Sequence, residues 1–164
     1  THTEWIGDAS GDPRKGLAEA VLSGVRGAKT LVAYHAVFEK RCIVQLAGFL
    51  RPDEGKELLE ANERFVDLLP LVRNCLYHPD FGGSFSLKSV VRSMLPDLQY
   101  GDLEVQSGDV AGLHLERLIL PGHTMNEAER DQMQTALLDY CRRDTLVMVR
   151  LYQTLLSLAV STPA

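Results

Sequence analysis

The sequence lacks the features that define several whole classes of protein. It has three cysteines, Cys42, Cys75 and Cys141, and an odd number with no secretory signal indicates reduced thiols and excludes a disulfide framework. Its longest uncharged apolar stretch near the end, 151–160, is far shorter than a membrane span, so no membrane segment is expected. No initiator methionine or signal peptide opens the chain. We therefore expect a cytoplasmic protein whose first residue, Thr1, is the cut edge of a longer chain.

The short motifs of several large enzyme classes are also missing. The sequence has no Gly-x-Ser-x-Gly elbow, no Walker loop and no dinucleotide-binding glycine fingerprint, which removes the usual hydrolase, nucleoside triphosphatase and Rossmann patterns. A basic surface is missing as well, because the net charge is −5 and the pI is about 5.5. That charge excludes a protein that coats DNA indiscriminately. It is compatible with a nuclease, whose metal-binding carboxylates are themselves acidic.

What the sequence does contain is the composition of one folded domain. Of its 164 residues, 45% are hydrophobic and 24% charged, so we expect residues 1–164 to form a single globular domain. The apolar periodicity alternates between strands and helices and then becomes helical. The predicted elements are a short strand over 2–6, a helix from Asp12 and Pro13 to Gly27, a buried strand over 30–34, a helix from 37 to 51, and helices over 86–94, 109–120 and 124–158.

The stretch 54–76 is the least certain part of this pattern. Most of it has helical propensity, but Phe65 and Val66 are typical of a brief edge strand, with Asp67 capping the helix that follows. Periodicity alone leaves both interpretations open. The fold class predicted from the whole pattern is α/β, with a short, mainly parallel sheet and a helix-rich C-terminal half.

Two acidic positions stand out as candidates for chemistry. Tyr140 and Asp144 are four residues apart in the last predicted helix, on the apolar face that also carries Leu137 and Met148, so the carboxylate needs a partner, a proton or a metal. The alternative is a solvated Asp144, or one paired with Arg143. Glu39 follows the strand 30–34, where open α/β sheets place their ligands. Its alternative role is a favourable charge in the first turn of a helix.

These segments resemble a known pattern. The run 35–39, His-Ala-Val-Phe-Glu, looks like the second motif of the ribonuclease-H-like, proofreading-type 3′ to 5′ exonuclease superfamily (DEDD, tyrosine subtype), and 140–144, Tyr-Cys-Arg-Arg-Asp, looks like its third motif. More narrowly, segments over 34–39, 66–70, 77–81, 84–88 and 139–146 are similar to the bacterial family called domain of unknown function 2779. This likeness extends over nearly the whole chain.

The resemblance implies a partial ribonuclease-H-like exonuclease fold with its first strands missing. It also implies a pair of Mg²⁺ or Mn²⁺ ions, with Glu39 and Asp144 as metal ligands and Tyr140 as the residue that orients or helps to activate the attacking water. The catalytic residues on this mapping are Tyr140, Glu39 and Asp144, and the partner is DNA or RNA. Residues expected to contact substrate are His35, Phe38, Lys88 and Arg143.

The sequence departs from the superfamily pattern in two ways. The first motif, Asp-x-Glu on the first strand, supplies two of the four acids, and no such strand precedes Thr1; Asp8 and Asp12 lie in a turn-rich loop and are poor substitutes. Glu39 also stands where the superfamily usually has Asp. We therefore expect this chain alone to bind divalent metal poorly and not to cleave nucleic acid.

Two other functions are compatible with the sequence. Cys75 and His78 have half of a zinc-like spacing that His114, His123 or Cys141 could complete, but without a second close pair we expect Cys75 to be a small core residue and His78 a loop residue. The second alternative is a non-catalytic module that binds nucleic acid or protein with a degenerate nuclease fold. An upstream Asp-x-Glu motif in the parent protein would favour the enzyme, and its absence would favour the module.

Overall fold

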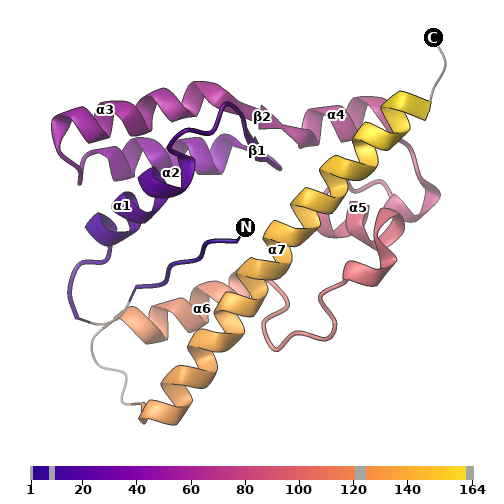
Figure 1. The fold of residues 1–164 in the computed structure, drawn as a ribbon. Helices are drawn as coiled ribbons and strands as arrows, with labels where there is room; N and C mark the ends of the chain where they lie inside the picture. The colour runs from indigo at the N-terminus through magenta and orange to yellow at the C-terminus, as the bar shows by residue number, and fades with distance from the viewer. Residues whose placement is uncertain (1, 8–9, 121–124, 162–164) are drawn as a thin grey trace.

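The computed structural model describes residues 2–7, 10–120 and 125–161. Within these residues the protein is mainly helical, with seven α-helices and one two-stranded parallel sheet (Figure 1). The elements in order are α1 (Arg14–Val25), β1 (Leu31–Ala33), α2 (Val37–Ala47), α3 (Pro52–Ala61), β2 (Phe65–Asp67), α4 (Leu68–Cys75), α5 (Leu87–Met94), α6 (Gly108–Ile119) and α7 (Glu127–Ser161). Short 3₁₀ turns lie at Asn62–Arg64, Pro79–Phe81 and Pro96–Leu98.

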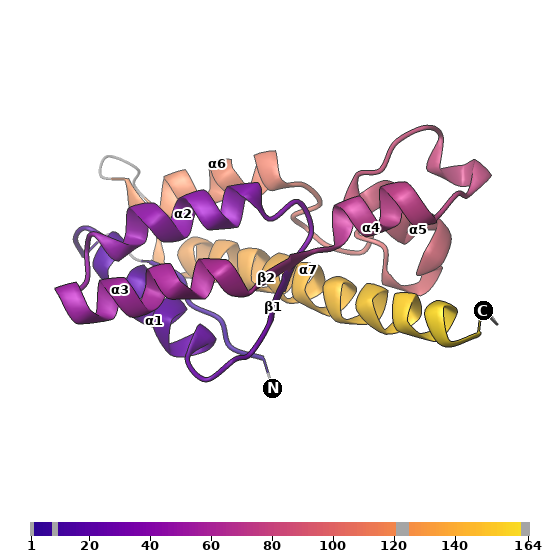
Figure 2. The same ribbon diagram turned by 90° about the horizontal axis from the view of Figure 1, so that it is seen from above.

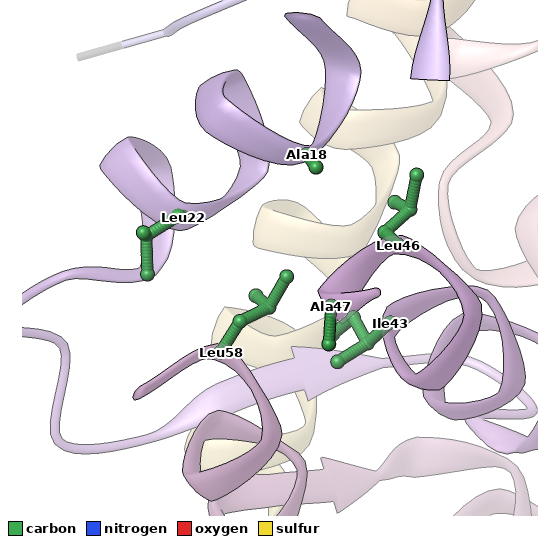
Figure 3. Close-up of a cluster of buried hydrophobic side chains, with 6 residues drawn as sticks. All are labelled: Ala18, Leu22, Ile43, Leu46, Ala47 and Leu58. Carbon is green, nitrogen blue, oxygen red and sulfur yellow. The ribbon is translucent and has the colours of Figure 1, made fainter. Parts of the chain in front are cut away.

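The first three helices pack around a core of their own, which we call the first core. Its buried members come from all three helices, and Figure 3 shows them pointing toward one another. They are Ala18, Leu22, Ile43, Leu46, Ala47 and Leu58. Gly55 lets α3 approach α2 closely, because a Cβ at this position would lie 2.6 Å from the carbonyl oxygen of Ala47. The first core is therefore aliphatic and tightly packed.

The sheet joins this helical group to the rest of the molecule. Leu31 pairs with Phe65 and Val32 with Val66, in parallel register. The strand predicted at 30–34 is thus confirmed. Of the two interpretations left open for 65–66, the structure has the edge strand, with Asp67 capping α4. The prediction that the strand at 30–34 is buried was wrong for Val32, which is 38% exposed, whereas Ala33 is buried. Among the described residues the sheet has two strands of three residues each.

A second core forms where α4 and α5 meet the C-terminal half of α7. Its buried members are Leu68, Val72, Phe81, Val90 and Leu151. In Figure 2, α7 runs beneath both groups of helices, and the strands lie at the junction between them. The opposite, N-terminal half of α7 packs against α6. One long helix therefore connects the C-terminal elements. Tyr34, which follows β1, packs against the second core and links the N-terminal group to them.

Three of the later helices begin at side chains that cap their first backbone N–H groups. Ser86 and Ser107 each accept a backbone N–H three residues on, at 3.2 Å and 3.4 Å. The last helix is opened by a reciprocal pair: Asn126 Oδ1 accepts from the Glu129 backbone, and the Glu129 carboxylate accepts from the Asn126 N–H. The helix predicted over 124–158 is thus observed from Glu127, and Thr124 lies outside the described residues.

The strand predicted for residues 2–6 does not form. This segment has no regular secondary structure and is held by side chains instead. Trp5 packs against Gly16 of α1, where a Cβ would lie 2.9 Å from the indole, and Arg142 of α7 donates to Glu4 at 3.4 Å. Residues 2–6 have a β-prone composition, but a strand forms only when it can pair with a neighbouring strand. Neither β1 nor β2 pairs with this segment.

The surface is large for the mass of the chain. Its accessible area is 10694 Å², against roughly 8,100 Å² for a compact monomer of 18.2 kDa. Part of the excess is apolar: Val149, Tyr152 and Leu156 are 41% to 48% exposed on the face of α7 that points away from its buried Leu151. An apolar groove of about 380 Å³ lies between α4 and the end of α7. Over the residues that the structure describes, no helix is long and apolar enough to cross a membrane.

Candidate functional site

The turn between β1 and α2 is tied to the end of β2 by one carboxylate. Asp67 accepts the backbone N–H groups of His35 at 2.8 Å and Ala36 at 3.0 Å, and that of Leu69 at 3.0 Å. His35 adopts a left-handed backbone (φ 65°), which is uncommon for a residue other than glycine. Asp67 therefore fixes a strained turn at the carboxyl ends of both strands. It also occupies the amides at the start of α2 that an external anion could have bound.

Glu39 lies in the first turn of α2, directly after this turn. Its Oε2 atom is buried and has no hydrogen-bond partner among the described residues. A buried polar atom without a partner costs about 1–3 kcal/mol, and more when it carries charge. Phe38 beside it is 59% exposed, and the Arg41 guanidinium stands 5.7 Å from the centre of its ring. The corner thus combines an unsatisfied acid with an exposed aromatic and cationic pair.

Asp144 lies on the face of α7 that packs against the loop after α5. Its Oδ1 accepts a 2.6 Å hydrogen bond from the hydroxyl of Tyr100, which is 7% exposed. The predicted partner Arg143 instead forms a double hydrogen bond with Asp102, at 3.0 Å and 2.7 Å, and also donates to the Gln99 carbonyl. Asp144 is therefore a partly buried acid with a neutral partner, which corrects the alternative of a solvated or Arg143-paired side chain.

Tyr140 lies one turn before Asp144, as its spacing predicted. Its ring centre is 5.9 Å from that of Tyr100, and its hydroxyl lies 3.9 Å from the position of a Cβ on Gly108, the first residue of α6. Burial and the nearby Asp144 carboxylate raise the pKa of Tyr140 to about 12. Burial, together with the hydrogen bond to Asp144, raises the pKa of Tyr100 further. Both phenols therefore stay protonated at neutral pH.

The remaining predicted site residues divide between these two places. Lys88 of α5 lies 5.3 Å above the Tyr100 ring and donates to the Gln106 carbonyl, so it belongs to the Asp144 side. Arg143 is on the same side but is engaged with Asp102. His35 and Phe38 share the β1–α2 corner with Glu39. The structure thus brings together Lys88, Tyr140, Arg143 and Asp144 in one group and His35, Phe38 and Glu39 in another.

The second core places the two groups along the same helix. Tyr34, the residue before His35, packs against the cluster around Leu151, and its hydroxyl donates to the Phe85 carbonyl at 2.7 Å. Met148 packs against the same cluster and lies one turn beyond Asp144 on α7. The β1–α2 corner and the part of α7 that follows Asp144 therefore meet the same apolar cluster. Among the described residues, Glu39 and Asp144 share no hydrogen bond or ion pair.

The donor chemistry of this chain suits a hard divalent cation but is incomplete. Glu39 and Asp144 offer carboxylate oxygens, which Mg²⁺ and Mn²⁺ prefer, and the Oε2 of Glu39 is buried without a hydrogen-bond partner among the described residues. No group of three or more His, Cys, Asp or Glu side chains that could hold a metal occurs in 2–7, 10–120 and 125–161. These two acids fit the role of partial ligands only.

The other metal and acid candidates lie elsewhere. Cys75 is exposed, which corrects the prediction of a core residue, and His78 lies in a loop where its Nδ1 accepts the Asp80 N–H at 3.2 Å. Asp12 pairs with Arg14 at 2.6 Å, and this guanidinium holds the pKa of the carboxyl down at about 2. Asp8 lies outside the described residues, as does His123.

A protein family described as a domain of unknown function (DUF2779) matches residues 1–86. The chain belongs to this family. The match contains Glu39, Phe38 and Asp67 but ends before α5, so the likeness over nearly the whole chain is supported for its first half. No curated protein and no solved structure matches the chain, and no ribonuclease-H fold is therefore assigned by similarity.

Two residues of this site were missed by sequence reasoning. Tyr100 stands in a loop with no motif around it, and only the structure reveals its bond to Asp144. Asp67 was recognised as a helix cap, but its bonds to the His35 and Ala36 amides, 32 and 31 residues away, depend on the parallel register of the two strands. A hint for Asp67 was available, because parallel strands bring their carboxyl ends together.

Proposed function

We propose that this chain forms part of a metal-dependent 3′ to 5′ exonuclease-like nuclease that acts on DNA or RNA. In this proposal the parent domain has a ribonuclease-H-like fold of the tyrosine subtype, and two further acids come from polypeptide outside residues 1–164. The observation that carries the proposal is the buried and unpartnered Glu39 Oε2 at the carboxyl end of a parallel strand, where a cation would satisfy it.

Each residue has a defined part in this mechanism. Mg²⁺ or Mn²⁺, when bound, activates a water and stabilises the leaving oxygen of a phosphodiester. Glu39 and Asp144 would hold the cations through their carboxylate oxygens. Tyr140 lies one turn before Asp144 on α7 and would orient, or help to activate, the attacking water. The chain itself therefore supplies ligands and orientation.

The substrate side of the proposal rests on the β1–α2 corner. Phe38 is exposed beside Glu39, and exposed aromatic side chains stack on the bases of single strands. Arg41 stands against the Phe38 ring and adds a positive charge near the path of a phosphate backbone. Lys88 has a lesser role than expected, because its ammonium already bonds to the Gln106 carbonyl. Arg143 is likewise held by Asp102.

The test uses the parent protein with the residues that precede Thr1 restored. Single-stranded DNA and RNA labelled at either end are incubated with Mn²⁺, and the length of the products is followed. We expect stepwise loss from the 3′ end that disappears in Asp144→Asn. The matched control is Asp53→Asn, which removes an exposed acid on α3. If a folded parent protein leaves all DNA and RNA strands intact, the proposed nuclease activity is wrong.

The same assay on residues 1–164 alone gives a second test. Because this segment contributes two ligands only, we expect no cleavage. Robust cleavage by the isolated chain that is lost in Asp144→Ala would show that the site is complete without other acids, contrary to the proposal.

A non-catalytic binding module is the second candidate. It is favoured by the absence of a three-ligand metal cluster in the part of the chain that the structure describes, and by the bonds that already engage Lys88 and Arg143. Under this alternative, the parent protein binds the strands without Mn²⁺, does not shorten them, and is indifferent to Asp144→Asn.

A further inference from the structure

The C-terminal half of α7 carries a row of exposed apolar side chains. Val149, Tyr152 and Leu156 are 41% to 48% exposed, and Ala159 is exposed beyond them. Their spacing of three, four and three residues places the four side chains in one line along the helix, as in the seam of a coiled coil. We call these four residues the α7 seam. A continuous apolar surface of this kind marks an interaction site.

The α7 seam borders a groove that is also apolar. The groove of about 380 Å³ between α4 and α7 is lined by three of the seam residues, and Leu71 and Cys75 of α4 are exposed on its other wall. The polar side chains Arg150 and Gln153 instead line a separate hollow beside the 3₁₀ turn Pro96–Leu98. The end of α7 is therefore amphipathic, and its apolar side is open to solvent.

Charge decides which class of partner suits this surface. Arg150 is the only charged residue between positions 145 and 160 of the sequence, and it lines the other hollow. Nucleic acid and anionic membranes both bind to surfaces that carry several cations. Interfaces between identical subunits are instead apolar and poor in charged residues. The α7 seam therefore has the composition of a homodimer interface.

The accessible surface of the chain is large enough for such an interface. Its 10694 Å² exceeds the area of a compact monomer of 18.2 kDa by about 2,600 Å². A standard interface takes about 800 Å² from each partner, and permanent homodimers take roughly 1,000–2,500 Å². The first described residues leave the seam open, because Trp5 packs on α1 and Glu4 bonds to Arg142 near the middle of α7.

We propose that two copies of this chain associate through the α7 seam, with their two α7 helices antiparallel. This inference is independent of the proposed function. When a two-fold axis relates the helices, Tyr152 of each copy meets Leu156 of the other, and Val149 meets Ala159. Each pair joins a larger side chain to a smaller one and occurs twice. The seam is thus complementary to itself, as a two-fold interface requires.

Sedimentation equilibrium of residues 1–164 tests this association. We expect the mass to rise with concentration from the 18.2 kDa of one chain to twice that value. Tyr152→Glu brings two negative charges close to the two-fold axis, so it should weaken association by more than about 10-fold. The matched control is Gln153→Glu, which adds the same charge on the other side of the helix and should associate as the wild type does.

A charge exchange tests the antiparallel pairing itself. Tyr152→Glu and Leu156→Lys should each weaken self-association. An equal mixture of the two variants should form a heterodimer, because Glu at 152 then meets Lys at 156 while the second such pair keeps its native residues. Diluted until it dissociates, each variant should unfold in urea as the wild type does, since the seam is exposed in the monomer.

Three results would overturn the proposal. The first is a wild-type chain that stays monomeric at every concentration. The second is a mixture of the two variants that stays monomeric, or a Gln153→Glu chain that dissociates as readily as Tyr152→Glu. The third is a parent protein that is monomeric while residues 1–164 dimerise, because the seam is then covered by the parent's own polypeptide.

Discussion

The two halves of the molecule are stabilised in different ways. The N-terminal helices α1 to α3 enclose the first core, an aliphatic cluster in which Ala18, Leu58 and their neighbours are almost fully buried. The C-terminal half has a second core and, beside it, a set of polar contacts among Tyr100, Asp144 and Arg143. Apolar packing needs only volume and shape, whereas the polar contacts need particular atoms. The second half is therefore the part in which single functional groups matter most.

The largest expected effect is the loss of a core leucine in either half. Leu58 and Leu151 are both fully buried, and Leu→Ala at such positions costs about 2–5 kcal/mol of unfolding free energy. The matched control is Leu156→Ala, at a position of α7 that is 48% exposed. Urea unfolding measures all three. If Leu156→Ala lowers the unfolding free energy as much as Leu151→Ala does, α7 is packed differently from the arrangement described here.

A smaller effect tests the close packing of the first half. Gly55→Ala places a Cβ 2.6 Å from the Ala47 carbonyl oxygen, so we expect a loss of about 1–3 kcal/mol. Gly24→Ala in α1 meets nothing within 4 Å and should stabilise its helix by roughly 0.5–1 kcal/mol. The two changes are therefore expected to have opposite signs in thermal unfolding. If Gly55→Ala and Gly24→Ala raise the stability equally, α2 and α3 lie further apart than in this structure.

The junction between the halves depends on Asp67. In Asp67→Asn the amide oxygen can replace Oδ1, but the amide nitrogen faces the Ala36 N–H, and two donors then oppose each other. We expect a loss of about 1–2 kcal/mol. Amide hydrogen exchange should also accelerate at residues 35 and 36, while exchange in α7 stays slow. Unchanged exchange at these amides would contradict the role assigned to the carboxylate.

The weakest effect appears only at high pH. Burial raises the pKa of Tyr34 and of Tyr140 to about 12, above the value of about 10 for a free phenol. Because the folded-state pKa is the higher one, this contribution to stability is fully present below pH 10 and is lost as pH rises through 12. Ultraviolet titration of tyrosinate, with Tyr34→Phe and Tyr140→Phe for assignment, should show both groups ionising late. Ionisation of either near pH 10 would contradict their burial.

Local chemistry made much of this structure predictable. The start of α5 at Ser86 follows from its capping side chain, and the strand at 31–33 follows from its apolar, β-branched run. Tyr140 and Asp144 share a face because four residues make about one helical turn. Contacts between distant segments could not be predicted from the sequence. Tyr100 bonds to Asp144, 44 residues away, and residues 2–6 have no strand beside them. Whether a strand forms, or an acid finds a partner, depends on segments far away in the chain.

The central claim is that Glu39 from one half and Asp144 from the other bind the same pair of cations. The most direct measurement is a double-mutant cycle on Mn²⁺ binding in the parent protein, with Glu39→Gln, Asp144→Asn and both together. We predict that the two changes are strongly non-additive, because either one alone already disrupts the shared site. Additive effects, or no effect of Glu39→Gln, would show that the two acids do not act together and would contradict this account.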